Sequence, residues 1–171
     1  MNKLIVPSVI KIFFILIIAC SLPGCKMQVA KSGIMKDFDT GLSASYKNIF
    51  PEEVTLIMNN EVLNHTDIPL GESFILVNDK TTGLTAKNGK LSVGCSLLIK
   101  DEQGLELMNA ADLFEGNDEL EANPTTVLRC TVNNGKPMEV GKKYQVTATF
   151  WDKYGDGNVV NNVSVKIAAA L

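Results

Sequence analysis

The sequence has few of the residues from which catalytic and metal centres are built. It holds a single histidine, His65, in 171 residues, which excludes a metal centre with several histidine ligands. No serine lies in a nucleophile-elbow pattern, and no glycine-rich phosphate loop is present. His65 stands among turn-forming residues, which favours a loop histidine over the base of a Cys–His pair. We therefore predict a non-enzymatic protein with no catalytic residue, no metal site and no cofactor.

Aromatic and basic residues are also scarce. Aromatic residues make up 6% of the chain, and most of them lie within apolar alternation, which indicates core positions rather than a binding box. The chain carries 16 basic and 19 acidic residues, a net charge of −3. An acidic surface without basic clusters is a poor electrostatic match for nucleic acid, so we expect no nucleic-acid partner.

A secretory signal is indicated at the N-terminus. Eight consecutive apolar residues, 12–19, follow a start whose only charges are Lys3 and Lys11, and a short small-residue segment leads to Cys25. The apolar run is too short to span a bilayer, and a basic start, an apolar core and a small-residue site are the parts of a cleaved leader.

The four residues Leu22-Pro23-Gly24-Cys25 resemble the lipobox of bacterial lipoproteins. The resemblance implies cleavage before Cys25, thioether attachment of diacylglycerol to its sulfur, and acylation of the new amino terminus. Pro23 departs from the pattern, since Ala, Ser or a β-branched residue is usual there. Cys20 after Ile17-Ile18-Ala19 is a rival site, and an ordinary cleaved signal or an uncleaved anchor remains an alternative.

A lipidated Cys25 would place the protein in the cell envelope. Two or three acyl chains, palmitate among them, hold a protein at a membrane almost permanently. No aspartate follows Cys25, which resembles lipoproteins sorted to the outer membrane of Gram-negative bacteria; the sequence does not distinguish the periplasmic leaflet from the cell surface. We expect residues 1–24 to be a signal peptide and 25–41 a flexible tether. Residues 26–41 show neither the two-residue apolar period of a strand nor the 3.6-residue period of a helix. Removing the leader takes two lysines and no acid, which leaves a net charge of −5.

An all-β domain is expected over residues 42–171. Seven to eight short strands with turn residues between them, and no sustained helical period, predict a β-sandwich that resembles the immunoglobulin-like type. Asn88-Gly89 is the strongest hairpin signal. The tryptophan follows both domain cysteines instead of lying between them, which departs from the immunoglobulin pattern.

Two cysteines of this domain, Cys95 and Cys130, occupy inward positions of their expected strands. In an oxidising envelope they are possible disulfide partners, and closing a loop of about 35 residues would stabilise the fold by roughly 3.8 kcal/mol. Two unbridged buried thiols would fit the same pattern.

Acidic residues collect in two connections. Residues 112–121 include five carboxylates, and the turn 152–158 resembles a calcium loop at only some of its positions. A solvated connection and a hairpin turn explain the same residues. Metal binding is therefore not our expectation at either place.

The strand expected over 143–151 carries the candidate ligand face. Tyr144, Val146, Ala148 and Phe150 would point inward, whereas Gln145, Thr147, Thr149 and Trp151 would point outward. An exposed tryptophan beside hydroxyl and amide groups suits a stacked sugar ring, although packing on a neighbour such as Val160 would also explain it. The sequence thus predicts a lipid-anchored binding or scaffold module with an envelope protein partner, or alternatively a carbohydrate-binding lipoprotein.

Overall fold

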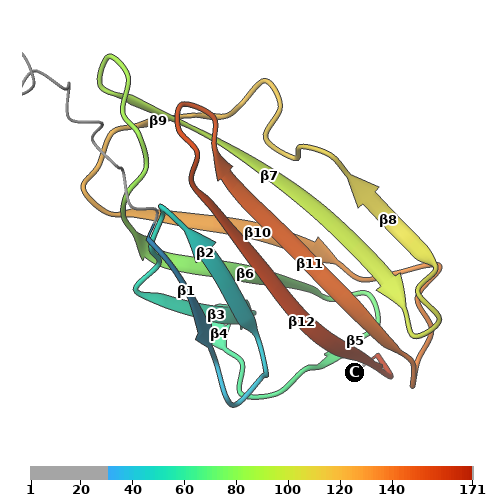
Figure 1. The fold of residues 1–171 in the computed structure, drawn as a ribbon. Coiled ribbons are helices and arrows are strands. Elements are labelled where there is room, and N and C mark those ends of the chain that lie inside the picture. The colour runs from blue at the N-terminus through green and yellow to red at the C-terminus, as the bar shows by residue number, and fades with distance from the viewer. Residues whose placement is uncertain (1–30, 171) are drawn as a thin grey trace, which may run out of the picture.

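The computed structural model describes residues 31–170, and all regular structure in them is β-strand. Twelve strands form two sheets that pack face to face (Figure 1). The predicted all-β sandwich is therefore confirmed. The proposed signal peptide, Cys20 and Cys25 lie outside the described residues. Residues 31–170 include no candidate for a membrane-spanning helix.

The larger sheet has six strands in the order β1-β2-β12-β11-β7-β8, with two short additions. β5 extends the β2 side of β12 in parallel, and β9 extends the β8 side of β7. The strands are β1 Ser32–Lys36, β2 Ser43–Lys47, β12 Asn158–Ala168, β11 Lys143–Asp152, β7 Lys90–Asp101, β8 Glu106–Ala110, β5 Asp67–Pro69 and β9 Glu119–Glu121.

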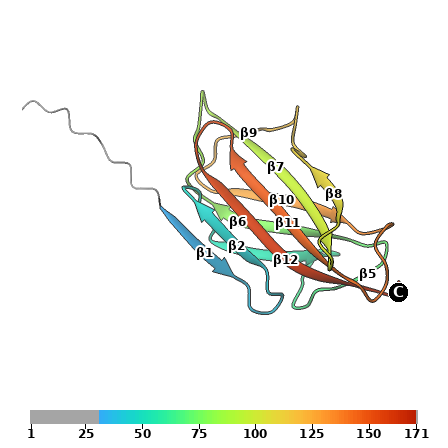
Figure 2. The same cartoon turned by 45° about the vertical axis from the view of Figure 1, so that its right-hand side comes forward.

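The smaller sheet has four antiparallel strands in the order β10-β6-β3-β4. They are β10 Thr126–Asn133, β6 Ser73–Thr81, β3 Glu53–Met58 and β4 Glu61–Val62. Figure 2 shows this sheet behind the long strands β7, β11 and β12. β1 contacts β3 at one side of the sandwich, so β10 lies on the side of β7 and β8.

The core lies between the sheets and follows the alternation of the long strands. In β11 the predicted inward residues are all buried, and Phe150 is fully buried. Phe74 of β6 is its counterpart in the smaller sheet, also with 0% exposure. Alternation fills one face of each strand because successive side chains point to opposite faces. Apolar alternation is a strong signal only in the long strands. The sequence therefore predicted seven or eight strands and did not indicate short ones such as β4, β5 and β9.

The expected tether is shorter than predicted. Residues 32–36 form β1, which pairs in antiparallel fashion with β2, Ser32 opposite Lys47. The prediction that residues up to Gly41 form a flexible tether is therefore wrong for this segment. The sequence does not indicate β1, because its side chains are at most half-buried and it therefore shows little apolar alternation. Backbone pairing with β2 holds this strand in the sheet.

The Asn88-Gly89 hairpin is confirmed. Both residues have positive φ, 51° and 75°, as a type I′ turn requires. The flanking Lys87 and Lys90 exchange two backbone hydrogen bonds of 2.8 and 2.9 Å. This turn starts β7, the strand that carries Cys95 and borders the candidate ligand face.

Candidate ligand face

The predicted outward residues of β11 do lie together on the outer face of the larger sheet. The pairing register places polar neighbours beside each of them, because side chains of directly paired residues share one face of a sheet. The resulting rows are Asn158–Trp151–Gly94, Val160–Thr149–Ser96, Asn162–Thr147–Leu98 and Ser164–Gln145–Lys100, each read from β12 through β11 to β7. Among the described residues no second layer covers this side, which we call the ligand face.

Trp151 lies over Gly94 of β7. A Cβ added at Gly94 would come closer than 3.0 Å to three indole atoms, Cε2, Cζ2 and Nε1. Glycine is thus required at position 94 by the close approach of the ring, not by backbone strain. The sequence had suggested Val160 as the residue that Trp151 would cover; the structure places the indole over the opposite neighbour. Trp151 remains partly exposed.

Hydroxyl and amide groups next to Trp151 are largely free to bind a ligand. Thr147 Oγ1 donates to Asn162 Oδ1 at 2.7 Å, which orients that amide. Within residues 31–170, no hydrogen bond engages the side chains of Thr149, Gln145 or Asn158. The face therefore offers both donors and acceptors beside an aromatic ring, with few charges.

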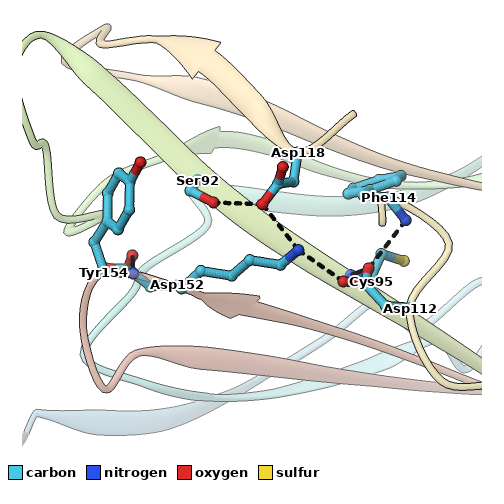
Figure 3. Close-up of polar contacts among 8 residues, drawn as sticks. Ser92, Cys95, Asp112, Phe114, Asp118, Asp152 and Tyr154 are labelled. Carbon is cyan, nitrogen blue, oxygen red and sulfur yellow. Dashed lines mark hydrogen bonds and ion pairs between the residues drawn. The ribbon is translucent and has the colours of Figure 1, made fainter. Parts of the chain in front are cut away.

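A charged cluster borders the Trp151 end of the face. Lys153 follows Trp151 at the next outward position, and its Nζ lies 2.8 Å from Asp112 Oδ2 and 2.9 Å from Asp118 Oδ2. Asp118 Oδ2 also accepts a 2.7 Å hydrogen bond from Ser92 Oγ (Figure 3). These three charged side chains are only 16–25% exposed, so the cluster is a partly buried ion network.

The network fixes the charges of its members. Hydrogen bonds from Ser92 and Lys153 lower the pKa of Asp118 to about 2. Burial raises the pKa of Asp112, but Lys153 and the backbone N–H groups of Cys95 and Phe114 outweigh it, so the net shift is downward. The two carboxylates raise the pKa of Lys153. All three groups are ionised at neutral pH, so neither carboxyl carries a proton for general acid catalysis.

The acidic connection after β8 completes the edge of β7. Asp112 Oδ1 accepts a hydrogen bond from Cys95 N–H at 3.1 Å, and Leu113 N–H donates to Cys95 O at 2.6 Å. Phe114 turns inward and packs on Phe150, with 6.2 Å between ring centroids. The sequence predicted a solvated connection, with a calcium loop as the alternative. In the structure, Asp112 and Asp118 of this connection form salt bridges with Lys153. No cluster of three or more His, Cys, Asp or Glu suited to a metal occurs in residues 31–170.

The two domain cysteines face each other across the core. Cys95 on β7 and Cys130 on β10 belong to opposite sheets, with exposures of 0% and 1%. Both are free thiols. The neighbouring Cys130 thiol and burial raise the pKa of Cys95. The structure confirms that they share one core, and the disulfide stays a prediction.

Two other candidates have local roles. His65 is exposed in the connection between β4 and β5. Asp152, in the turn compared with a calcium loop, accepts backbone hydrogen bonds from Thr85 N–H at 2.7 Å and Tyr154 N–H at 2.9 Å. Its carboxylate therefore holds the β11–β12 turn in place, as the hairpin interpretation requires.

Comparison with known proteins gives little beyond this geometry. No protein-family model matches the chain, and no curated protein matches it. Among solved structures, the chain is similar to the crystal structure of the C-terminal domain of wzt, with 9% sequence identity and a TM-score of 0.48. The match covers 82% of this chain and 80% of that one.

Several residues of the site were not predicted. Gly94, Lys153 and Asn162 became part of it only through the register of β7, β11 and β12. The sequence does indicate that Lys153 lies on the outer face, since it is two residues after Trp151 and residues two apart in a strand share one face. Its partners Asp112 and Asp118 lie far away in the chain, and local patterns carry no information on such pairs.

Proposed function

We propose that this protein is a lipid-anchored, non-catalytic binding module of the bacterial cell envelope, and that its partner binds the ligand face. The observation that supports this most directly is the open row of polar side chains around the partly exposed Trp151. A binding face needs unsatisfied donors and acceptors beside an apolar anchor, and this one has both.

The charged groups near the face favour binding over catalysis. Hydrolysis by paired carboxylates needs one acid that keeps its proton near neutral pH and a second that is ionised. Asp112 and Asp118 both have lowered pKa values and share Lys153. Their salt bridges to Lys153 serve instead to hold the 111–118 connection against β7.

The proposed anchor would hold the face near the membrane. Six residues, 26–31, separate Cys25 from β1, and a chain of that length reaches at most about 20 Å. Ser32 is paired with Lys47, and Lys47 with Asn158, which is the neighbour of Trp151. The lipid would therefore be attached at the Trp151 end of the face, within reach of partners at the membrane surface.

The anchor is tested by labelling the protein with alkyne-palmitate in its native host. We expect label in the wild type and in Cys20→Ser, and none in Cys25→Ser, which should also leave the membrane fraction. Equal labelling of Cys25→Ser, or its unchanged membrane retention, would reject lipidation at this residue.

The binding role is tested by blocking the face. Thr149→Arg places a long charged side chain in its centre, whereas Thr55→Arg does the same on the outer face of the smaller sheet. We expect pull-down from solubilised membranes to lose its partner only with Thr149→Arg. Equal recovery with both variants would exclude the ligand face as the contact surface.

Carbohydrate is the second candidate ligand, and Trp151 next to free amide and hydroxyl groups favours it. A sugar ring stacks on an indole while its hydroxyls bond to side chains such as Asn158 and Thr149. On a glycan array, Trp151→Ala should lose the signal of the full-length protein. Phe38→Ala, which removes an aromatic ring that is 87% exposed and lies away from the face, should keep it. Binding that survives Trp151→Ala would exclude this ligand mode.

A further inference from the structure

The smaller sheet ends in a free edge. β10 is its terminal strand and pairs only with β6. On the same side of the sandwich, the edge of β7 is covered by β8, β9 and the 111–118 connection. Within the described residues, no backbone hydrogen bond reaches the other side of β10. It contains no proline or lysine to protect this edge from a further strand.

The register shows which groups the free edge offers. Asn134 N–H donates to Glu72 O at 3.3 Å, and Asn133 is paired with Ser73. Along an antiparallel pair, every second residue bonds to the partner strand and the others point away. Cys130 and Val132 therefore bond to β6, whereas Arg129 and Thr131 direct their N–H and C=O groups outward.

An apolar hollow lies beside this edge. It measures about 250 Å³ and separates β10 from β9 and the 111–118 connection. Its lining is mostly apolar, and Leu120 and Val127 are still 41% and 42% exposed. The lining residues are Val93, Phe114, Asn117, Asp118, Leu120, Val127, Leu128 and Arg129. The volume suits one large apolar side chain of an added strand.

The charge at the hollow selects the kind of strand. Arg129 is the only arginine in the sequence, and no carboxylate of residues 31–170 forms a salt bridge with it. Asp118, across the hollow, already binds Lys153 and Ser92. β10 itself, TVLRCTVN, contains no carboxylate, so a second copy pairing through its own β10 would give Arg129 no acidic partner from that strand. An acidic strand is the complementary occupant.

We propose that the free edge of β10 binds an extended segment of a partner protein as an added strand. An apolar side chain of that segment fills the hollow, and a neighbouring carboxylate pairs with Arg129. Main-chain hydrogen bonds supply affinity in this mode, and the side-chain pocket supplies specificity. This site lies on the edge of the smaller sheet and is independent of the ligand face.

The test uses the full-length protein in detergent micelles and a fluorescein-labelled ten-residue peptide of alternating valine and glutamate, followed by fluorescence anisotropy. Thr131→Pro removes one outward N–H without touching the bonds to β6, and should weaken binding at least tenfold. Thr131→Val keeps the N–H and should bind within twofold of the wild type. Arg129→Gln should weaken this peptide but leave a valine–glutamine peptide unaffected.

Backbone NMR keeps the proposal testable even if Thr131→Pro does not fold. On addition of the valine–glutamate peptide, hydrogen exchange of Arg129 and Thr131 N–H should slow at least tenfold, whereas Cys130 and Val132 are protected beforehand. Unchanged exchange at Arg129 and Thr131, or equal binding by Thr131→Pro and Thr131→Val, would overturn the proposal. So would peptide-independent dimerisation that Thr131→Pro abolishes, because the occupant would then be a second copy.

Discussion

The contact between Trp151 and Gly94 allows a sharp prediction for Gly94→Ala. The new Cβ would meet the indole at less than 3.0 Å, whereas ordinary contacts are 3.4–4 Å, so the ring must move by roughly 1 Å. Overpacking costs typically 1–3 kcal/mol. The partly exposed ring can swing into solvent, which places the expected loss in unfolding free energy at about 1 kcal/mol.

The assay is direct because Trp151 is the only tryptophan in the chain. In Gly94→Ala its emission should shift to longer wavelength and acrylamide should quench it more strongly, while urea unfolding followed by circular dichroism gives the lost stability. Gly135→Ala is the matched control, since an added Cβ there meets nothing within 4 Å. In a Trp151→Ala background the cost of Gly94→Ala should approach zero. Unchanged emission and quenching in Gly94→Ala would refute the placement of the indole over β7.

Three further predictions follow from the charged cluster and the cysteines. Lys153→Met should raise the pKa of Asp118 from about 2 towards its ordinary value, as measured by carboxyl NMR titration; an unchanged titration would remove Lys153 from the network. Because Asp112 and Asp118 have lower pKa values in the folded state than in the unfolded state, they stabilise the fold above about pH 4 and lose this effect as the pH falls to about 2. The gap in melting temperature between wild type and Lys153→Met should therefore close over that range, and a constant gap would contradict the reasoning. Export to an oxidising compartment should join Cys95 and Cys130 by thiol–disulfide exchange with a protein disulfide, and reduction should then cost about 3.8 kcal/mol; two reactive thiols in the purified, denatured protein would contradict it.

Much of the fold could be predicted because the apolar alternation of a long strand shows which of its faces is buried. The alternation of β11 identified both its buried face and the outward position of Trp151, and the Asn88-Gly89 turn identified the start of β7. Cys95 and Cys130 occupy inward positions in the alternation of their strands, and this alone predicted that they share one core. These are local consequences of the two-residue period of a strand.

The remaining features depend on pairing between distant segments. β1 has no apolar alternation, and its place in the sheet comes from backbone bonds to β2. Lys153 meets Asp118 only because the connection after β8 returns along β7. Gly94 accommodates an indole from the neighbouring strand, and nothing in its own sequence context shows this. Such contacts are set by topology and register, which a single sequence does not specify.

The central claim is that a partner binds the outer face of the larger sheet. It is tested most directly by placing the photo-crosslinking residue benzoylphenylalanine at position 149, in the centre of the face, and in a second variant at the exposed position 61 of β4. On irradiation of intact cells of the native host, the account predicts a discrete crosslinked adduct from position 149 and none from position 61. Adducts from position 61 but none from position 149 would contradict it.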